Sequence, residues 1–110
     1  MFFQTHNDKR IRQAQPINCI GTHFQGHLTL NYNDIKKVFG KPLGGDGYKV
    51  DAKWEIEFAD GVVATIYNYK DGKNYNGASG LPKTKITDWH IGGHDERAVR
   101  NVIKAMGRKI

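Results

Sequence analysis

The stretch that decides the fold is "VDAKWEIEFADGVVATIYNY", residues 50–69. In its first half, apolar residues at positions 50, 52, 54, 56 and 58 alternate with charged residues at 51, 53, 55 and 57. This period predicts a strand with one buried face and one solvent-facing face. "ADG" at 59–61 is typical of a turn, and "VVATIYNY" at 62–69 has the composition of an antiparallel partner strand. The stretch therefore predicts a β-hairpin within an antiparallel sheet.

The segments that precede the hairpin are shorter and less regular. "PINCIGTHFQGHLTLNY" at 16–32 predicts two short extended segments on either side of a glycine-bounded loop. "NYNDIKKVFGKP" at 31–42 predicts a short helix capped by Asn31 or Asn33 and ended by Gly40 and Pro42. Residues 1–15 contain little apolar material, so we expect a loosely ordered arm there.

The segments that follow the hairpin complete the fold. We expect an irregular loop at about 70–85, then a strand in "KITDWHI" at 85–91 that Gly92 and Gly93 end. Asp95 is expected to cap a C-terminal helix with an apolar stripe at 98, 99, 102, 103 and 106. Residues 1–110 are thus predicted to form one α+β domain, a small antiparallel sheet packed by a short helix and a C-terminal helix.

Composition narrows the class of protein. The chain of 110 residues has a formal net charge of +6 and one cysteine, Cys19. The charge favours anionic partners, although solubility alone can also account for it. The apolar runs are far shorter than the ~20 residues of a membrane span, and the first residues do not resemble a signal peptide. We therefore expect no membrane partner and a reducing compartment.

The sequence does not assemble a catalytic or metal site. The pairs His23/His27 and His90/His94 have a helical metal-ligand spacing, but glycines interrupt both segments. "HLT" at 27–29 is a single H-x-T element. Ser79 has no G-x-S-x-G context, and Cys19 has no base nearby in the sequence. We expect no cofactor, no metal and no enzymatic activity.

Recognition residues are concentrated after the second hairpin strand. "YNYKDGKNYNG" at 67–77 combines aromatic rings for stacking, amides for base edges and lysines for phosphates, which are the needs of a nucleotide site. Arg97, Arg100 and Arg108 of the terminal helix region are candidate phosphate or ring partners. The segment "IGTHFQG" at 20–26 adds backbone amides next to its glycines, together with the side chains of Thr22, His23 and Gln25.

The order "GTHFQG…FGKP…GDGYKVDAKWEIEFADG…ATIYNYKDG…DWHIGG" resembles small proteins of tailed bacteriophages, over about residues 17–106. Among these it looks like the type 1 Thoeris anti-defence proteins. That resemblance implies a sponge that sequesters cyclic ADP-ribose isomers, and in some members cyclic oligonucleotides, without cleaving them. It also implies a homo-oligomer, a dimer or larger, in the cytoplasm of the host bacterium.

The resemblance adds Asp88 as a polar partner of the ligand. It also implies a second ligand site, for cyclic oligonucleotides, in the "GTHFQG" loop, with Gly21, Thr22, His23 and Gln25. The complete predicted ligand site is Asn68, Tyr69, Lys70, Asn74, Tyr75, Asn76, Asp88, Arg97, Arg100 and Arg108. The main alternative is a small basic phage protein that binds DNA or RNA with the same surface. An inhibitor of a host protein and an enzyme that degrades the signal are further alternatives.

Overall fold

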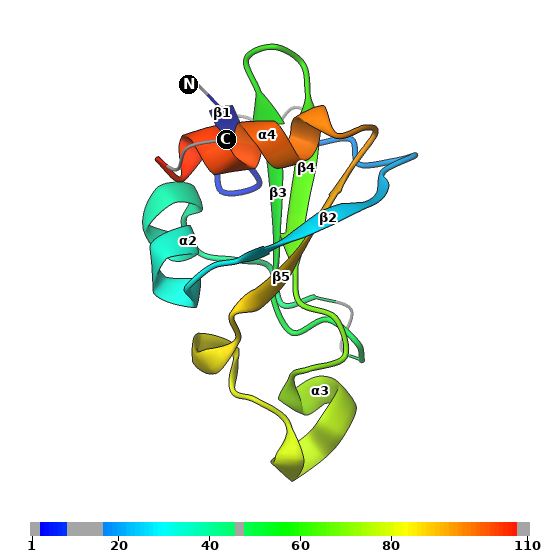
Figure 1. Ribbon diagram of the computed structural model, residues 1–110, viewed down its shortest axis with the longest axis vertical. Helices are drawn as coiled ribbons and strands as arrows, with labels where there is room; N and C mark the ends of the chain where they lie inside the picture. The colour runs from blue at the N-terminus through cyan, green and yellow to red at the C-terminus, as the bar shows by residue number, and fades with distance from the viewer. Residues whose placement is uncertain (1–2, 9–16, 46–47, 108–110) are drawn as a thin grey trace.

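The computed structural model describes residues 3–8, 17–45 and 48–107 (Figure 1). It contains a five-stranded sheet in the order β1-β3-β4-β5-β2, with each neighbouring pair antiparallel. The strands are β1 (Phe3–Thr5), β2 (His23–Thr29), β3 (Lys53–Phe58), β4 (Val63–Tyr67) and β5 (Asp88–Gly93). The helices are α2 (Tyr32–Phe39), α3 (Lys73–Asn76) and α4 (Arg97–Ala105). The predicted α+β fold is confirmed.

The predicted hairpin is formed by β3 and β4. Their register runs from Lys53 opposite Tyr67 to Glu57 opposite Val63. At the turn the Asp60 carboxylate accepts a hydrogen bond from the Val62 amide at 3.1 Å. Gly61 has φ 85°, a left-handed conformation that favours glycine over residues with a Cβ.

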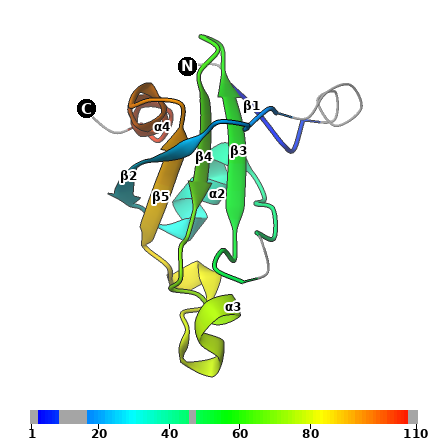
Figure 2. The ribbon, with the colours of Figure 1, turned by 90° about the vertical axis from the view of Figure 1, so that its right-hand side faces the viewer.

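Both longer helices cover the same face of the sheet. Side chains of α2 and α4 join the inward-facing side chains of β3, β4 and β5 in one apolar cluster. Trp54 and Trp89 are fully buried in it, and their ring centroids are 5.4 Å apart. Figure 2 shows α2 behind β3 and β4, so none of the helices in the described part of the chain covers the opposite face of these strands. We call this opposite face the open face.

The helix ends follow the predicted capping residues closely. The Asn31 side chain accepts a hydrogen bond from the Asn33 amide at 2.8 Å and caps α2. The Asp95 carboxylate accepts one from the Arg97 amide at 2.9 Å at the start of α4. Each bond satisfies a backbone donor that has no partner within its helix.

Two expectations about the strands were wrong, and the bounds of a third strand differ from those expected. Residues 23–29 form one strand, β2, with a bulge between Phe24 and Gly26, and no loop separates two segments. Strand β5 includes Gly92 and ends at Gly93, so these glycines are its last two residues and do not follow it. Phe3–Thr5 of the expected loose arm pairs with β3, and the Phe3 ring lies 4.9 Å from that of Phe39. Residues 9–15 of that arm lie outside the described residues.

The expected irregular loop at 70–85 contains short helical segments. These are α3 and two 3-10 turns, Gly77–Ser79 and Lys83–Lys85. In both ribbon views α3 lies at one end of the molecule and α4 at the other (Figures 1 and 2). Among the described residues, no helix has the length and apolar character needed to cross a membrane.

Candidate functional site

The open face carries the side chains that the core does not use. Alternation along the strands places Glu55 of β3, Thr65 and Tyr67 of β4, and His90 of β5 on this face. The bulge in β2 is needed to add Phe24 and His27 to the same face. Phe24 is opposite Gly92, and His27 is opposite His90, because Gln25 is an extra residue between them.

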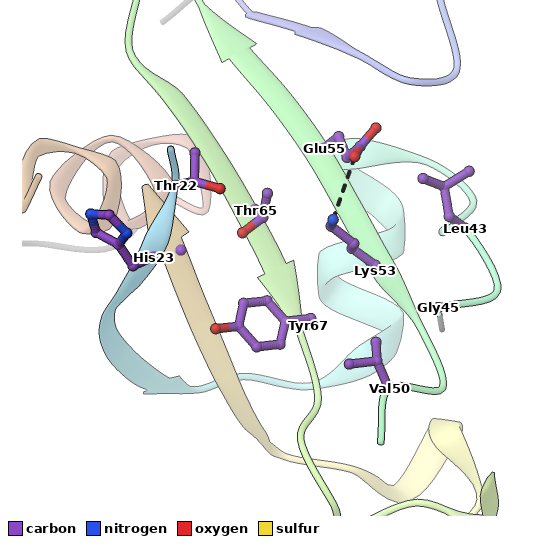
Figure 3. A pocket seen from close by; sticks show the side chains of 10 residues that line it. Thr22, His23, Leu43, Gly45, Val50, Lys53, Glu55, Thr65 and Tyr67 are labelled. Carbon is purple, nitrogen blue, oxygen red and sulfur yellow. Dashed lines mark ion pairs between the residues drawn. The ribbon is translucent and has the colours of Figure 1, made fainter. Parts of the chain in front are cut away.

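A cavity of about 450 Å³ lies over the middle of the open face (Figure 3). Its volume is within the range of small-molecule sites. It is lined by Thr22, His23, Leu43, Gly45, Val50, Lys53, Glu55, Thr65, Tyr67 and Gly92. Hydroxyl, imidazole, ammonium and carboxylate groups therefore surround one hollow.

Gly92 permits the close packing of side chains at the floor of this cavity. A Cβ at position 92 would collide with Oγ1 of Thr65 and would lie 3.4 Å from Cε1 of Tyr67. The missing side chain leaves room for Tyr67 to border the cavity. Burial of the hydroxyl raises the pKa of Tyr67, so it is a neutral hydrogen-bonding group at pH 7.

The charged groups at the other side of the cavity are paired. Nζ of Lys53 lies 3.5 Å from Oε2 of Glu55 (Figure 3). The same carboxylate oxygen lies 3.5 Å from Sγ of Cys19, which donates a hydrogen bond to it. Burial, followed by the negative charge of Glu55, raises the pKa of Cys19 to about 12. The thiol is therefore protonated at neutral pH, and we assign it no role as a nucleophile.

An aromatic hollow of about 280 Å³ adjoins the cavity and is lined by Phe24, Tyr67, Tyr69 and His90. Tyr67 borders both spaces, so the two are neighbours on one face. The His90 ring lies 4.9 Å from Phe24, 5.5 Å from Tyr67 and 5.6 Å from Tyr69 between centroids. Burial by these rings lowers the pKa of His90, so its imidazole is neutral at pH 7. Phe24 and Tyr69 remain 49% and 42% exposed, which leaves ring surface for a ligand.

Two lysines connect this hollow to the segment around α3. Nζ of Lys70 lies 5.3 Å from the Tyr69 ring centroid and 5.5 Å from that of Tyr75. Nζ of Lys49 lies 5.9 Å from the Tyr69 ring centroid. Tyr75 in turn packs on Tyr48, with centroids 5.3 Å apart. Rings and ammonium groups thus form a strip, Tyr48, Lys49, Tyr69, Lys70 and Tyr75, beside the hollow.

Lys70 reaches this position through an unusual backbone conformation. Its φ is 64°, and no other non-glycine residue among those described has a positive φ. Such a conformation costs roughly 1–3 kcal/mol and is concentrated at functional sites. The Lys70 amide is fixed by a 2.8 Å hydrogen bond to the Lys49 carbonyl. The predicted residues Tyr69, Lys70 and Tyr75 are therefore brought together.

The predicted asparagines have a different role. Asn68 is fully buried, and its side-chain oxygen accepts hydrogen bonds from the amides of Asp51 and Ala52 at 2.7 and 3.1 Å. Its side-chain nitrogen donates to the carboxylates of Asp51 and Asp71, each at 3.0 Å. No part of the Asn68 side chain is accessible to a ligand, so we remove it from the site.

Asn74 and Asn76 hold the segment around α3 in place. The Asn74 side chain donates a hydrogen bond to the Val50 carbonyl at 3.3 Å, and the backbone amide of Asn74 donates one to the Asp51 carboxylate at 3.1 Å. The Asn76 side chain donates to the Lys70 carbonyl at 2.8 Å. These contacts explain the asparagines as supports of the strip, and Asp51 as an anchor that the sequence did not reveal.

The predicted arginines lie away from the strip. Arg97 forms a two-pronged ion pair with Asp95 at 2.9–3.2 Å, and Arg100 lies 3.8 Å from Glu96. Both belong to α4, at the end of the molecule opposite α3 (Figure 1). Within one chain the structure does not bring them to Tyr69 and Tyr75. Arg108 lies outside the described residues.

The predicted second site is divided. Thr22 and His23 line the cavity of the open face. The Gln25 side chain donates to the Gly93 carbonyl at 2.9 Å, as part of the bulge. Gly21 lies against His94, whose Cε1 would be 3.5 Å from a Cβ at position 21. The two predicted sites therefore share one face through Tyr67, which borders both spaces.

Asp88 lies at the far end of the open face. Its carboxylate is 3.2 Å from Nδ1 of His27, and both side chains are exposed. His27 pairs across the strands with His90, with ring centroids 5.1 Å apart. The sequence spacing pairs His27 with His23 and His90 with His94, but neither His23 nor His94 belongs to this cluster.

The residues that sequence reasoning missed are Phe24, Tyr48, Lys49, Tyr67 and His90. Strand alternation gives Tyr67 and His90 the same orientation as Thr65, but only a correct register shows that these strands are neighbours. Comparison of the chain with protein-family models, curated proteins and solved structures finds no match. We therefore infer function from the open face and from the resemblance described above.

Proposed function

We propose that this chain is a phage-encoded sponge that binds a cyclic nucleotide signal of the host and does not cleave it. The observation that supports this proposal is the open face, where a cavity and an aromatic hollow adjoin at Tyr67 beside a strip of rings and lysines. Aromatic surface, polar groups and ammonium groups are what a base, a ribose and a phosphate require.

The exposed rings of Tyr69 and Phe24 stack on the base in this proposal. Lys49 and Lys70 pair with the phosphates, and Thr22, His23 and Thr65 bond to ribose hydroxyls. One stacked ring and two paired phosphates can give roughly −8 to −12 kcal/mol, or micromolar to nanomolar affinity. A sponge acts by mass action, so it requires this range and no chemical step.

The same proposal includes a homo-oligomer in the host bacterial cytoplasm. Ile20, Phe24, Tyr48 and Leu81 expose between 45% and 84% of their surface, so a second subunit has apolar area to cover. The hollows are open to solvent on one side, and a second subunit placed over them would exclude water from a bound ligand. Light scattering on the purified protein, with and without ligand, measures the subunit number.

The test uses calorimetry with purified protein and separate cyclic ADP-ribose isomers and cyclic trinucleotides. We expect saturable binding of at least one ligand, and heating of the complex should release it intact, as identified by mass spectrometry. Tyr69→Ala should weaken binding by roughly 5- to 160-fold, because stacking on an aromatic ring contributes about 1–3 kcal/mol per base.

Lys70→Ala should also weaken binding, whereas Lys37→Ala on the exposed side of α2 is the matched control for the loss of one charge. Release of ligand fragments would indicate a hydrolase. Failure to bind any cyclic nucleotide would refute the proposal.

A specific observation also favours the alternative, a protein that binds single-stranded nucleic acid. An antiparallel sheet with exposed rings and nearby lysines is a common platform for unpaired bases. The dependence of affinity on salt separates the two functions. A polyanion ligand predicts a steep fall of affinity with salt, and a ligand with two phosphates predicts a shallow one.

A further inference from the structure

His27, Asp88 and His90 form a cluster on the open face, where β2 pairs with β5. His27 and His90 are direct partners across β2 and β5, and Asp88 precedes His90 by two residues on the same face. One potential ligand atom from each of the three residues lies within 4.8 Å of the others. Among the described residues, this is the group of histidine, cysteine and acidic side chains close enough to hold a metal.

The donor set determines which ions fit. Two imidazole nitrogens and one carboxylate oxygen suit Zn²⁺ and other divalent transition metals better than Mg²⁺ or Ca²⁺, which prefer oxygen ligands. Two ligands bound to one such ion lie ~3 to 3.5 Å apart, since each metal–ligand distance is about 2.0–2.2 Å. Nδ1 of His27 and Oδ1 of Asp88 are already 3.2 Å apart.

The three side chains differ in exposure in a way that suits metal binding. His27 and Asp88 have side-chain exposures of 56% and 63%, so an ion from solvent can reach them and they can adjust their rotamers. His90 is held among the rings of Phe24, Tyr67 and Tyr69. A fixed imidazole with two adjustable ligands can close around an ion with little change of the backbone.

We propose that His27, Asp88 and His90 form a binding site for one divalent transition-metal ion, with Zn²⁺ as the probe. Three protein ligands leave at least one coordination position for water or an anionic oxygen. The site adjoins the aromatic hollow, because His90 belongs to both. The proposal does not depend on nucleotide binding, since the metal alone tests it.

The test titrates Zn²⁺ into untagged, chelator-treated protein, by calorimetry and by competition with a chromophoric chelator. We expect one saturable site with a Kd for Zn²⁺ below about 10 μM, since two imidazoles and one carboxylate are a typical set of protein ligands for this ion. His27→Ala and Asp88→Asn should each weaken binding at least about tenfold. Both residues are exposed, so neither change threatens folding, and circular dichroism checks this.

His23→Ala and His94→Ala are the matched controls, because each removes an imidazole outside the cluster. Their affinity for Zn²⁺ should equal that of the unchanged protein. Absence of saturable binding below about 100 μM would overturn the proposal, as would unchanged affinity in the His27 and Asp88 variants. Loss of binding in a control variant would place the ion elsewhere and overturn it equally.

Discussion

Asn68 shows how one buried amide can determine the shape of a functional surface. Its four hydrogen bonds join the residues before β3 to the segment after β4. Asn68→Ala would remove the acceptor of the Asp51 and Ala52 backbone amides and the donor to the carboxylates of Asp51 and Asp71. We expect the free energy of unfolding to fall by about 2–3 kcal/mol, as measured by chemical denaturation.

Asn74→Ala is the matched control for this prediction, because Asn74 is exposed and its side-chain hydrogen bond is longer, at 3.3 Å. Its effect on stability should be smaller. An Asn68→Ala variant that kept full stability and lost ligand affinity would return Asn68 to the binding site.

At the residue scale, the sequence could identify the types of side chain but not their partners. "YNYKDGKNYNG" correctly located Tyr69, Lys70 and Tyr75 near one another, because they are close in the chain. The same composition could not distinguish Asn68 from a ligand residue, since its partner Asp51 lies 17 positions earlier. Burial of a polar group depends on contacts that the local sequence does not contain.

A polar contact between side chains joins helix α4 to the β3–β4 turn. The buried Asn101 side chain donates hydrogen bonds to both oxygens of Asp60, at 3.2 and 3.0 Å. These bonds, together with that from the Val62 amide, lower the pKa of Asp60. The contact therefore stabilises the fold more while Asp60 is ionised than after it is protonated.

Asn101→Ala should lower the melting temperature at pH 7. Because the folded pKa of Asp60 is depressed, this stabilisation is present above the unfolded pKa of about 3.9 and is lost as the pH falls through the folded value. The difference in melting temperature between the Asn101→Ala variant and the unchanged protein should thus be constant from pH 6 to 8 and decrease below about pH 4. Thermal melts across this range check it, and a difference independent of pH would contradict it.

At the scale of elements, local pattern was sufficient for the hairpin and for both longer helices. The two-residue period of β3 and the capping residues Asn31 and Asp95 act over a few positions. The glycines of β2 and β5 misled the prediction. Gly26 and Gly92 were interpreted as breaks, but each allows another element to approach, Val99 of α4 and Thr65 of β4 respectively.

At the scale of the whole molecule, two groups of cations lie far apart. Lys49 and Lys70 lie by the aromatic strip, and Arg97 and Arg100 lie on α4 at the opposite end (Figure 1). If one chain forms the site, the double variant Arg97→Ala, Arg100→Ala should keep the affinity for a cyclic nucleotide within about twofold. Lys49→Ala, Lys70→Ala removes the same charge and should weaken it far more.

Calorimetry on both double variants measures this difference. A strong effect of the arginine variant would instead mean that α4 of a second subunit completes the site. The sequence could not make this distinction, because the placement of α3 and α4 at opposite ends follows from strand order, which no local pattern specifies.

The bulge in β2 has a consequence for how the length of this strand can vary. Gln25 is the residue without a partner in the register, so a chain that lacked it would still place Phe24 opposite Gly92 and His27 opposite His90. Loss of one residue between 27 and 29 would instead reverse the orientation of the residues beyond the deletion. A deletion of Gln25, natural or engineered, should therefore be tolerated, whereas a deletion of one residue between 27 and 29 should not be.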